Sequence, residues 1–348
     1  MKMIAVSSAV ILTMLTGCQS THSNQIDSTN EKGIKHPSFA VYNIEKQAAA
    51  DLKQQAEELA LLSERYCASD NLSLSELQAS WRKSQHLWMH LQGQERGPQE
   101  ALSLGWSIQF WPDKKNTTGR KMSALVKSGK SYRAAELLEQ SVTVQGLSAL
   151  EWLFFDVNSP AIKQDTNAAC RLLPAVTQAF ETNAGTINAA WQTNPWLSMD
   201  DSAWTAEYIA LMNNQLEYAI SKFVRPMANI GKPRPYFAES WRSKQSLTNL
   251  KFNLQALRSL YLADGSGLDN RLRELGYVDL ADRVLSQFDS IINGWPDHSD
   301  LFDSLQTKPG YRDALLIKNK LDQLKYLMHD EVAVELGVVI GFNSTDGD

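Results

Sequence analysis

Several features that would assign a protein class are scarce in this chain of 348 residues. No block of like charges occurs, and 34 Lys and Arg against 39 Asp and Glu leave a net charge of −5. A nucleic-acid-binding surface needs clustered basic residues, so nucleic acid is excluded as a partner. The 18 Gly and 11 Pro are too few for a fibrous protein, and no segment alternates convincingly between apolar and polar residues as a strand would. A globular, helical protein remains.

The motifs of several common enzyme classes are also missing. The sequence contains no Gly-rich phosphate loop, no nucleophile elbow and no Ser-His-Asp order. His86 and His90 have the i, i+4 spacing of two metal ligands, but no glutamate completes a His-Glu-x-x-His zinc motif. We interpret them as two exposed histidines on a helix.

An apolar run long enough to cross a membrane is lacking at the N-terminus. Ile4 to Leu15 follows Lys2 and is too short for a transmembrane helix, which needs about 20 residues, but it suits the core of a signal peptide. Leu15-Thr16-Gly17-Cys18 resembles a bacterial lipobox. We therefore predict a signal peptide at residues 1–17, a lipid on Cys18 and a flexible tether at residues 18–38.

The predicted lipid attaches the protein to a membrane of the bacterial cell envelope. By resemblance to the bacterial sorting rule, Gln19 in place of Asp favours the outer membrane, with the protein facing the periplasm. Of the three cysteines, Cys67 and Cys170 then remain, an even pair in an oxidising compartment. They predict a disulfide, the alternative being two separate buried thiols.

The rest of the chain has the apolar spacing of helices. We predict an all-α fold of two similar antiparallel four-helix bundles packed together, with an N-terminal bundle at residues 39–198 and a C-terminal bundle at residues 199–348. A proline-rich break at residues 225–235 is the alternative boundary. The recurrence of Trp111-Pro112-Asp113 as Trp295-Pro296-Asp297 suggests an internal duplication. The expected helices are Phe39–Tyr66, one beginning after Ser73, Ser131–Phe155, Thr166–Trp191, Ala203–Ala228, Ser240–Ala263, Leu268–Ile292 and Tyr311–Phe342.

One apolar stretch, residues 142–155, carries a polar stripe. Gln145, Ser148 and Glu151 are spaced by three, and Gly146 leaves room beside them for another backbone or a ligand. Glu151 is the single charge of the run, and a buried carboxylate must be paired, metal-bound or protonated. An ion pair with Arg242 or Arg258 that only orients helices is the structural alternative.

A second polar stripe begins at Trp241-Arg242-Ser243 and continues through Asn249 and Asn253. Arg242 is a suitable partner for a partly buried carboxylate. We therefore predict a ligand pocket where the two stripes meet, between the bundles. Its candidate residues are Gln145, Gly146, Ser148, Glu151, Trp241, Arg242, Ser243, Asn249 and Asn253, with Glu151 as a candidate metal ligand.

Four segments resemble imelysin-like proteins. They are residues 145–151, Phe110-Trp111-Pro112-Asp113, Ser240-Trp241-Arg242-Ser243, and the ending from Leu336-Gly337 through Gly341-Phe342-Asn343 to Asp348. The resemblance implies an all-α fold of two four-helix bundles and a periplasm-facing lipoprotein linked to iron uptake. It further implies a metal ion, iron, as the cofactor to consider and other iron-uptake envelope proteins as partners.

The same family is catalogued among metallopeptidases through a Gly-x-His-x-x-Glu motif. The motif maps onto Gly146, Ser148 and Glu151, so a serine stands at the histidine position. Since a hydroxyl is a poor zinc ligand beside an imidazole, we predict a ligand-binding or accessory lipoprotein rather than an enzyme. A metal-dependent peptidase is the alternative, and a purely structural envelope protein a third.

Overall fold

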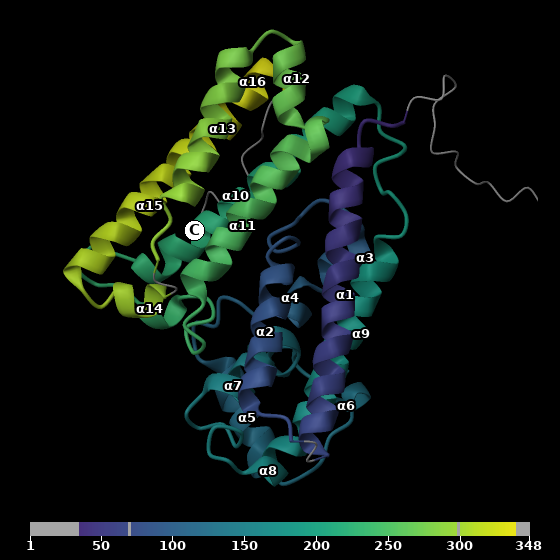
Figure 1. Ribbon diagram of the computed structural model, residues 1–348, viewed down its shortest axis with the longest axis vertical. Helices are drawn as coiled ribbons and strands as arrows, with labels where there is room; N and C mark the ends of the chain where they lie inside the picture. Colours follow the sequence, from purple (N-terminus) through teal and green to yellow (C-terminus); the bar gives the residue numbers. More distant parts are fainter. Residues whose placement is uncertain (1–34, 69–70, 298–299, 339–348) are drawn as a thin grey trace, which may run out of the picture. The chain divides into compact units, whose positions relative to one another are not determined.

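The computed structural model describes residues 35–68, 71–297 and 300–338, and within them it contains helices and no strand (Figure 1). The predicted all-α fold is therefore confirmed. The predicted signal peptide, Cys18 and residues 339–348 lie outside the described residues, as does nearly all of the predicted tether. In the described part of the chain, no helix is both long and apolar enough for a membrane span.

The first half of the described chain is built on α1 and α9, which pack along each other, with α2 and α7 against them (Figure 1). Leu52, Ala56 and Leu59 lie on the buried face of α1, as its apolar spacing predicts. The helix expected after Ser73 is α2, and Ser73 and Glu76 form a capping box at its start. The helices are α1 Phe39–Cys67, α2 Leu74–Trp88, α3 Gln99–Ser103, α4 Gly105–Ile108, α5 Thr117–Lys127, α6 Ala134–Leu138, α7 Gly146–Phe155, α8 Thr166–Cys170 and α9 Leu173–Ala190, with a 3₁₀ turn, η1, at Val142–Val144.

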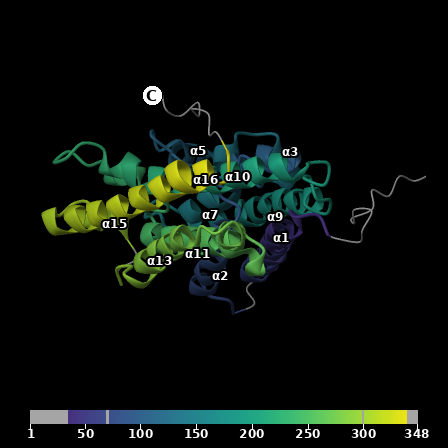
Figure 2. The same cartoon turned by 90° about the horizontal axis from the view of Figure 1, so that it is seen from above.

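In the second half, α10 packs against α11 and α15, and α13 lies beside both α11 and α15 (Figure 1, Figure 2). These helices are α10 Asp201–Met227, α11 Ser246–Leu262, α12 Leu268–Glu274, α13 Val278–Asn293, α14 Leu301–Ser304, α15 Lys308–Tyr326 and α16 Ala333–Glu335. Two 3₁₀ turns, η2 Pro235–Phe237 and η3 Ala263–Gly265, and a π-helical turn, η4 Leu327–Val332, complete the order.

Helices pack mostly with others of their own half, and the halves meet where α2 contacts α11 and where α1 contacts η3. The described residues from Pro37 to Val338 belong to one compact unit. The boundary between residues 198 and 199 and the duplication of one bundle stay predictions.

The prediction of a single helix at Ser131–Phe155 is wrong. The segment forms α6, η1 and α7, and it breaks at Gly146, whose φ is +60°. A Cβ at Gly146 would lie 2.2 Å from the carbonyl oxygen of Ser107 and 2.3 Å from that of Ile108. Of the two occupants predicted for the space beside Gly146, another backbone or a ligand, the structure shows the backbone, at a distance that only glycine permits.

Other expected helices are also shorter or divided. The one beginning at Ser240 starts only at Ser246, and the one over residues 268–292 is divided near Gly276, whose φ is +89°. The helix expected over residues 166–191 is divided between α8 and α9, with Pro174 in the first turn of α9. The stretch before residue 128, expected to be irregular, contains α3, α4 and α5. Glycine in a left-handed conformation and proline in a first helical turn both favour such boundaries.

The predicted disulfide is confirmed. Cys67 at the end of α1 and Cys170 at the end of α8 are bonded, with 5.6 Å between their Cα atoms. The bond joins segments separated by 103 positions in the sequence.

Candidate functional site

Glu151 projects from α7 towards the turn that precedes α11. Its side chain is 5 % exposed, because α7 is apolar and packs against α2, α5 and α9. The backbone N–H and the Oγ–H of Ser243 both donate to Glu151 Oε1, each at 3.0 Å. The structure thus brings the two predicted polar segments into contact at a buried carboxylate.

Arg242 lies beside this carboxylate but is bound more tightly elsewhere. Its Nη1 is 3.9 Å from Glu151 Oε2, whereas its Nε donates to Asp156 Oδ2 at 2.8 Å and its Nη2 donates to Asn116 Oδ1 at 2.6 Å. The guanidinium also lies over the ring of Trp241, at 4.3 Å from the ring centre. Asp156, absent from the sequence prediction, is therefore the main ionic partner of Arg242.

The environment of Glu151 favours its protonated form. Burial raises the pKa of the carboxyl, and this exceeds the lowering by Arg242 and by the two hydrogen bonds from Ser243. Within the described residues, Glu151 Oε1 accepts both bonds from Ser243, and Oε2 accepts none. In that part of the chain, Oε2 has only the ionic contact of 3.9 Å with Arg242 Nη1. One oxygen is therefore held by the protein and the other is left for a further partner.

A small cavity opens beside Ser148, Glu151 and Arg242. Its volume is about 30 Å³, which is room for one water molecule or an atom group of similar size. Ser148 is half-buried there, and its hydroxyl donates to the carbonyl of Phe110 at 3.2 Å. The other lining residues are Trp81, Gln109, Phe110, Trp111, Asp113, Thr118, Leu147, Tyr236, Ala238, Ser240 and Trp241.

Of the first predicted stripe, Gln145 and Gly146 lie away from this cavity. Gln145 precedes α7 rather than belonging to it, so it does not continue a stripe with Ser148 and Glu151. Its amide donates to the carbonyl of Leu137 at 2.9 Å and its Oε1 accepts from Asn183 at 3.3 Å. The carbonyl groups of Ser107 and Ile108 fill the space beside Gly146. Both residues position α7 and do not line the space beside Glu151.

Asn249 and Asn253 belong to a second buried network, which the sequence prediction missed. Its centre is an ion pair of 2.8 Å between Lys222 Nζ and Glu239 Oε2, two side chains that are each 1 % exposed. Asn249 donates to Glu239 at 3.2 Å, and Lys222 donates to Asn253 Oδ1 at 2.7 Å. Gln92 of the first half donates to Glu239 Oε1 at 2.6 Å, so this network also joins the two halves.

One signal for Lys222 was available in the sequence. It is the one cation on the face of α10 that carries Ala219, Phe223 and Met227, all of which are buried. A lysine on an otherwise apolar helical face needs a partner. Its partner Glu239 could not be identified, because an irregular segment offers no periodicity from which burial could be inferred.

The two networks are connected through the turn before α11. Ser243 Oγ also lies 3.0 Å from the carbonyl oxygen of Ser240, so this oxygen and Glu151 Oε1 share its single proton, and Asn249 donates to Ser240 Oγ at 3.1 Å. Polar contacts therefore continue from Glu151 through Ser243, Ser240 and Asn249 to Glu239.

The residues around Glu151 do not fit a resident metal ion. In the described ranges, no group of three or more His, Cys, Asp or Glu is placed to hold one. Arg242 would repel a cation at Glu151, and the neighbouring Ser243 groups donate hydrogen bonds rather than accept them.

His86 and His90 are half-buried, so the expectation that they are exposed is wrong. The His86 ring stacks on Phe252 at 4.1 Å, and burial lowers its pKa to about 4.

Comparisons with known proteins agree with this architecture. A peptidase-family model described as Imelysin matches residues 45–328. A crystal structure of an imelysin-like protein from Psychrobacter arcticum is similar with a TM-score of 0.71 and 18 % identity, over 88 % of this chain and 96 % of that one. A structure of a putative iron-regulated protein A precursor from Parabacteroides distasonis has a TM-score of 0.60 and 13 % identity, over 86 % and 93 % of the two chains. A comparison with curated protein sequences gave no match.

Proposed function

Because the chain belongs to the imelysin family, we propose that it is a ligand-binding accessory lipoprotein of the bacterial cell envelope that serves iron uptake. The link to iron is supported by the similar fold of a protein described as iron-regulated. The envelope location rests on the lipobox-like Leu15-Thr16-Gly17-Cys18.

The observation that carries the proposal is the half-satisfied carboxylate of Glu151 beside a cavity. A purely structural ion pair would place Arg242 directly on Glu151, yet the short contact of Arg242 goes to Asp156. Glu151, Ser148 and Arg242 all line one small space, and within the described residues Glu151 Oε2 has only the 3.9 Å contact with Arg242. We infer that one polar group of a ligand enters there, with the rest of the ligand outside the cavity.

A metal-dependent peptidase is the second candidate, because the matching family model carries that class name. Ser148 stands where the peptidase motif has histidine, and its hydroxyl is engaged with the carbonyl of Phe110. Chelator-sensitive cleavage of casein that disappears in Glu151→Gln would support the peptidase instead.

Two substitutions test the cavity. Ser148→Leu fills it without changing any charged group, and Glu151→Gln removes the titratable carboxyl but keeps an acceptor for Ser243. We expect both to reduce growth in iron-limited medium to the level of a deletion strain. The loss of the Ser148 hydrogen bond costs stability of about 1 kcal/mol, so melting temperatures should change little.

Ser128→Leu, at an exposed serine that also hydrogen-bonds to a backbone carbonyl, is the matched control and should grow normally. If both cavity variants grow like the wild type, the ligand site is not at Glu151. If growth falls only in proportion to the amount of folded protein, the role of Glu151 is structural.

The lipid anchor has its own test. Cys18→Ala should prevent lipidation, so that the protein leaves the membrane fraction or accumulates as a precursor of larger mass. Membrane fractionation with mass spectrometry of the N-terminus measures both. A Cys18→Ala protein that stays in the outer membrane at the wild-type mass would contradict the anchor.

A further inference from the structure

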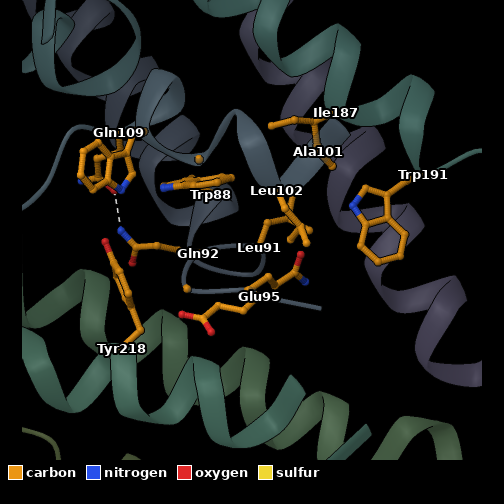
Figure 3. A pocket seen from close by; sticks show the side chains of 14 residues that line it. Trp88, Leu91, Gln92, Glu95, Ala101, Leu102, Gln109, Ile187, Trp191 and Tyr218 are labelled. Atoms are coloured by element: carbon orange, nitrogen blue, oxygen red, sulfur yellow. Dashed lines mark hydrogen bonds between the residues drawn. The ribbon is translucent and has the colours of Figure 1, made fainter. Parts of the chain in front are cut away.

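A second and larger cavity lies apart from Glu151, between the loop after α2 and the helices α3, α4, α9 and α10. Its volume is about 230 Å³, enough for a small organic molecule. It shares Gln109 with the Glu151 cavity, and Gln109 accepts a hydrogen bond from Gln92 at 2.6 Å (Figure 3). Nothing in the proposed function uses this space.

Four aromatic side chains line the larger cavity, namely Trp88, Trp106, Trp191 and Tyr218. Figure 3 shows Trp88, Trp191 and Tyr218 on different sides of it, each from a different part of the chain. Trp106 is 63 % exposed, which is unusual for so large an apolar side chain and leaves its ring available to a ligand. Electron-rich rings therefore form part of the wall on several sides.

The only charged residue among those that line this cavity is Glu95. Its carboxylate is exposed and makes no ion pair within the described part of the chain, and Figure 3 places it between Tyr218 and Trp191. The adjacent Arg96 does not line the cavity and pairs with Glu207 at 3.5 Å. The net charge of the lining is thus negative.

One cation does approach the ring of Tyr218 from elsewhere. Lys222 Nζ lies 6.0 Å from the centre of that ring, but Glu239 pairs with it at 2.8 Å. Burial raises the pKa of Tyr218, so its hydroxyl stays protonated and contributes no charge. Neither group offsets Glu95.

The loop that carries Glu95 is shaped to lie against the rings. Gly93 has a φ of +81°, and a Cβ there would lie 2.6 Å from Tyr218 Cβ. Gly97 has a φ of +138°, and a Cβ there would lie 2.9 Å from Trp191 Cζ2. The two glycines flank Glu95, so any larger residue at either position would move the carboxylate away from the aromatic walls.

We propose that this cavity binds a small organic cation, an alkyl-substituted ammonium group held by the rings and by Glu95. Aromatic faces attract a cation within about 6 Å of their centres, and desolvation inside a cavity strengthens this attraction. A carboxylate at the entrance adds a charge of the correct sign, whereas an anion would be repelled and a neutral ligand would gain nothing from Glu95. The proposal does not depend on the Glu151 site.

Titration calorimetry with choline, and with its uncharged carbon isostere dimethylbutanol, tests this directly. The two probes have the same shape, so the difference between them reports the charge. We expect choline to bind at least about tenfold more tightly than dimethylbutanol. Trp106→Leu should weaken choline binding by about fivefold and change dimethylbutanol binding less.

Glu95→Gln should weaken choline binding by about threefold, an effect that salt reduces, and should leave dimethylbutanol unchanged. Glu100→Gln, at an exposed acid that does not line the cavity, is the matched control and should bind choline normally. The circular dichroism spectrum of each variant should match that of the wild type, which checks that the variant is folded. The proposal would be overturned if the two probes bound equally, or if Glu95→Gln and Glu100→Gln had equal effects. It would also be overturned if choline gave no heat of binding at about 10 mM, a concentration well above the dissociation constant of a complex of moderate affinity.

Discussion

Reduction of the Cys67–Cys170 disulfide should lower the free energy of unfolding by about 4–5 kcal/mol, the largest effect expected for any single bond in this protein. The bond closes a loop over 103 positions of the sequence, and a long closed loop restricts the unfolded chain strongly. The native contacts of α1 with α9 lie beside the bond and remain after reduction. The reduced protein should therefore keep its helical fold and unfold at a lower urea concentration.

Urea unfolding of the oxidised and reduced protein measures this difference. Cys67→Ser and Cys170→Ser should each reproduce the reduced protein, and the double variant should add almost nothing, because either change alone already removes the bond. Oxidised and reduced proteins with the same urea midpoint would contradict the prediction. A double variant much less stable than both single variants would show that packing of the thiols, rather than the bond, provides the stability.

Glu45→Gln should stabilise the protein at pH 7 by about 3 kcal/mol. Glu45 lies on the buried face of α1 and is 1 % exposed, and neither of its oxygens has a hydrogen-bond partner within the described residues. Burial raises the pKa of its carboxyl from 4.5 to about 8, although the side chain of Gln94 lowers it somewhat. Glutamine has the shape of the protonated acid but does not titrate.

The pH dependence follows from the raised pKa of Glu45. Between pH 4.5 and about pH 8 the folded protein keeps a proton that the unfolded chain loses, so unfolding is increasingly favoured as the pH rises. The stability of the wild type relative to Glu45→Gln should fall by about 1.4 kcal/mol per pH unit over this window and level off above it. Near pH 4 the two proteins should be almost equally stable.

Urea unfolding at several pH values, for the wild type and Glu45→Gln, isolates this group because all other titrations occur in both proteins. Glu58→Gln is the matched control, since Glu58 is an exposed acid on the same helix. That change should alter stability by less than about 0.5 kcal/mol at every pH. A stability difference between wild type and Glu45→Gln that does not change with pH would show that Glu45 titrates normally.

The candidate site was predictable in part, because the chemistry of a lone buried charge can be inferred from sequence. Glu151 stood alone in an apolar run, and Arg242 and Ser243 lay in a segment of suitable polarity, so their meeting could be anticipated. That the main partner of Arg242 is Asp156 could not, since it depends on where the end of α7 faces the turn before α11. The same holds for Asn249 and Asn253, whose partners are Glu239 and Lys222.

The sequence by itself determined the helical class, the register of α1 and α2, the pairing of Cys67 with Cys170 and the family. Each of these depends on local spacing, composition or a short motif, which tertiary contacts do not alter. The tertiary structure decided where helices break and which polar groups meet. The helix predicted over residues 131–155 breaks at Gly146, where the backbone of Ser107 and Ile108 approaches, and Glu95 lines a cavity together with four aromatic side chains because Gly93 and Gly97 let its loop lie against two of them. Such contacts join residues far apart in the chain, and no periodicity within one segment records them.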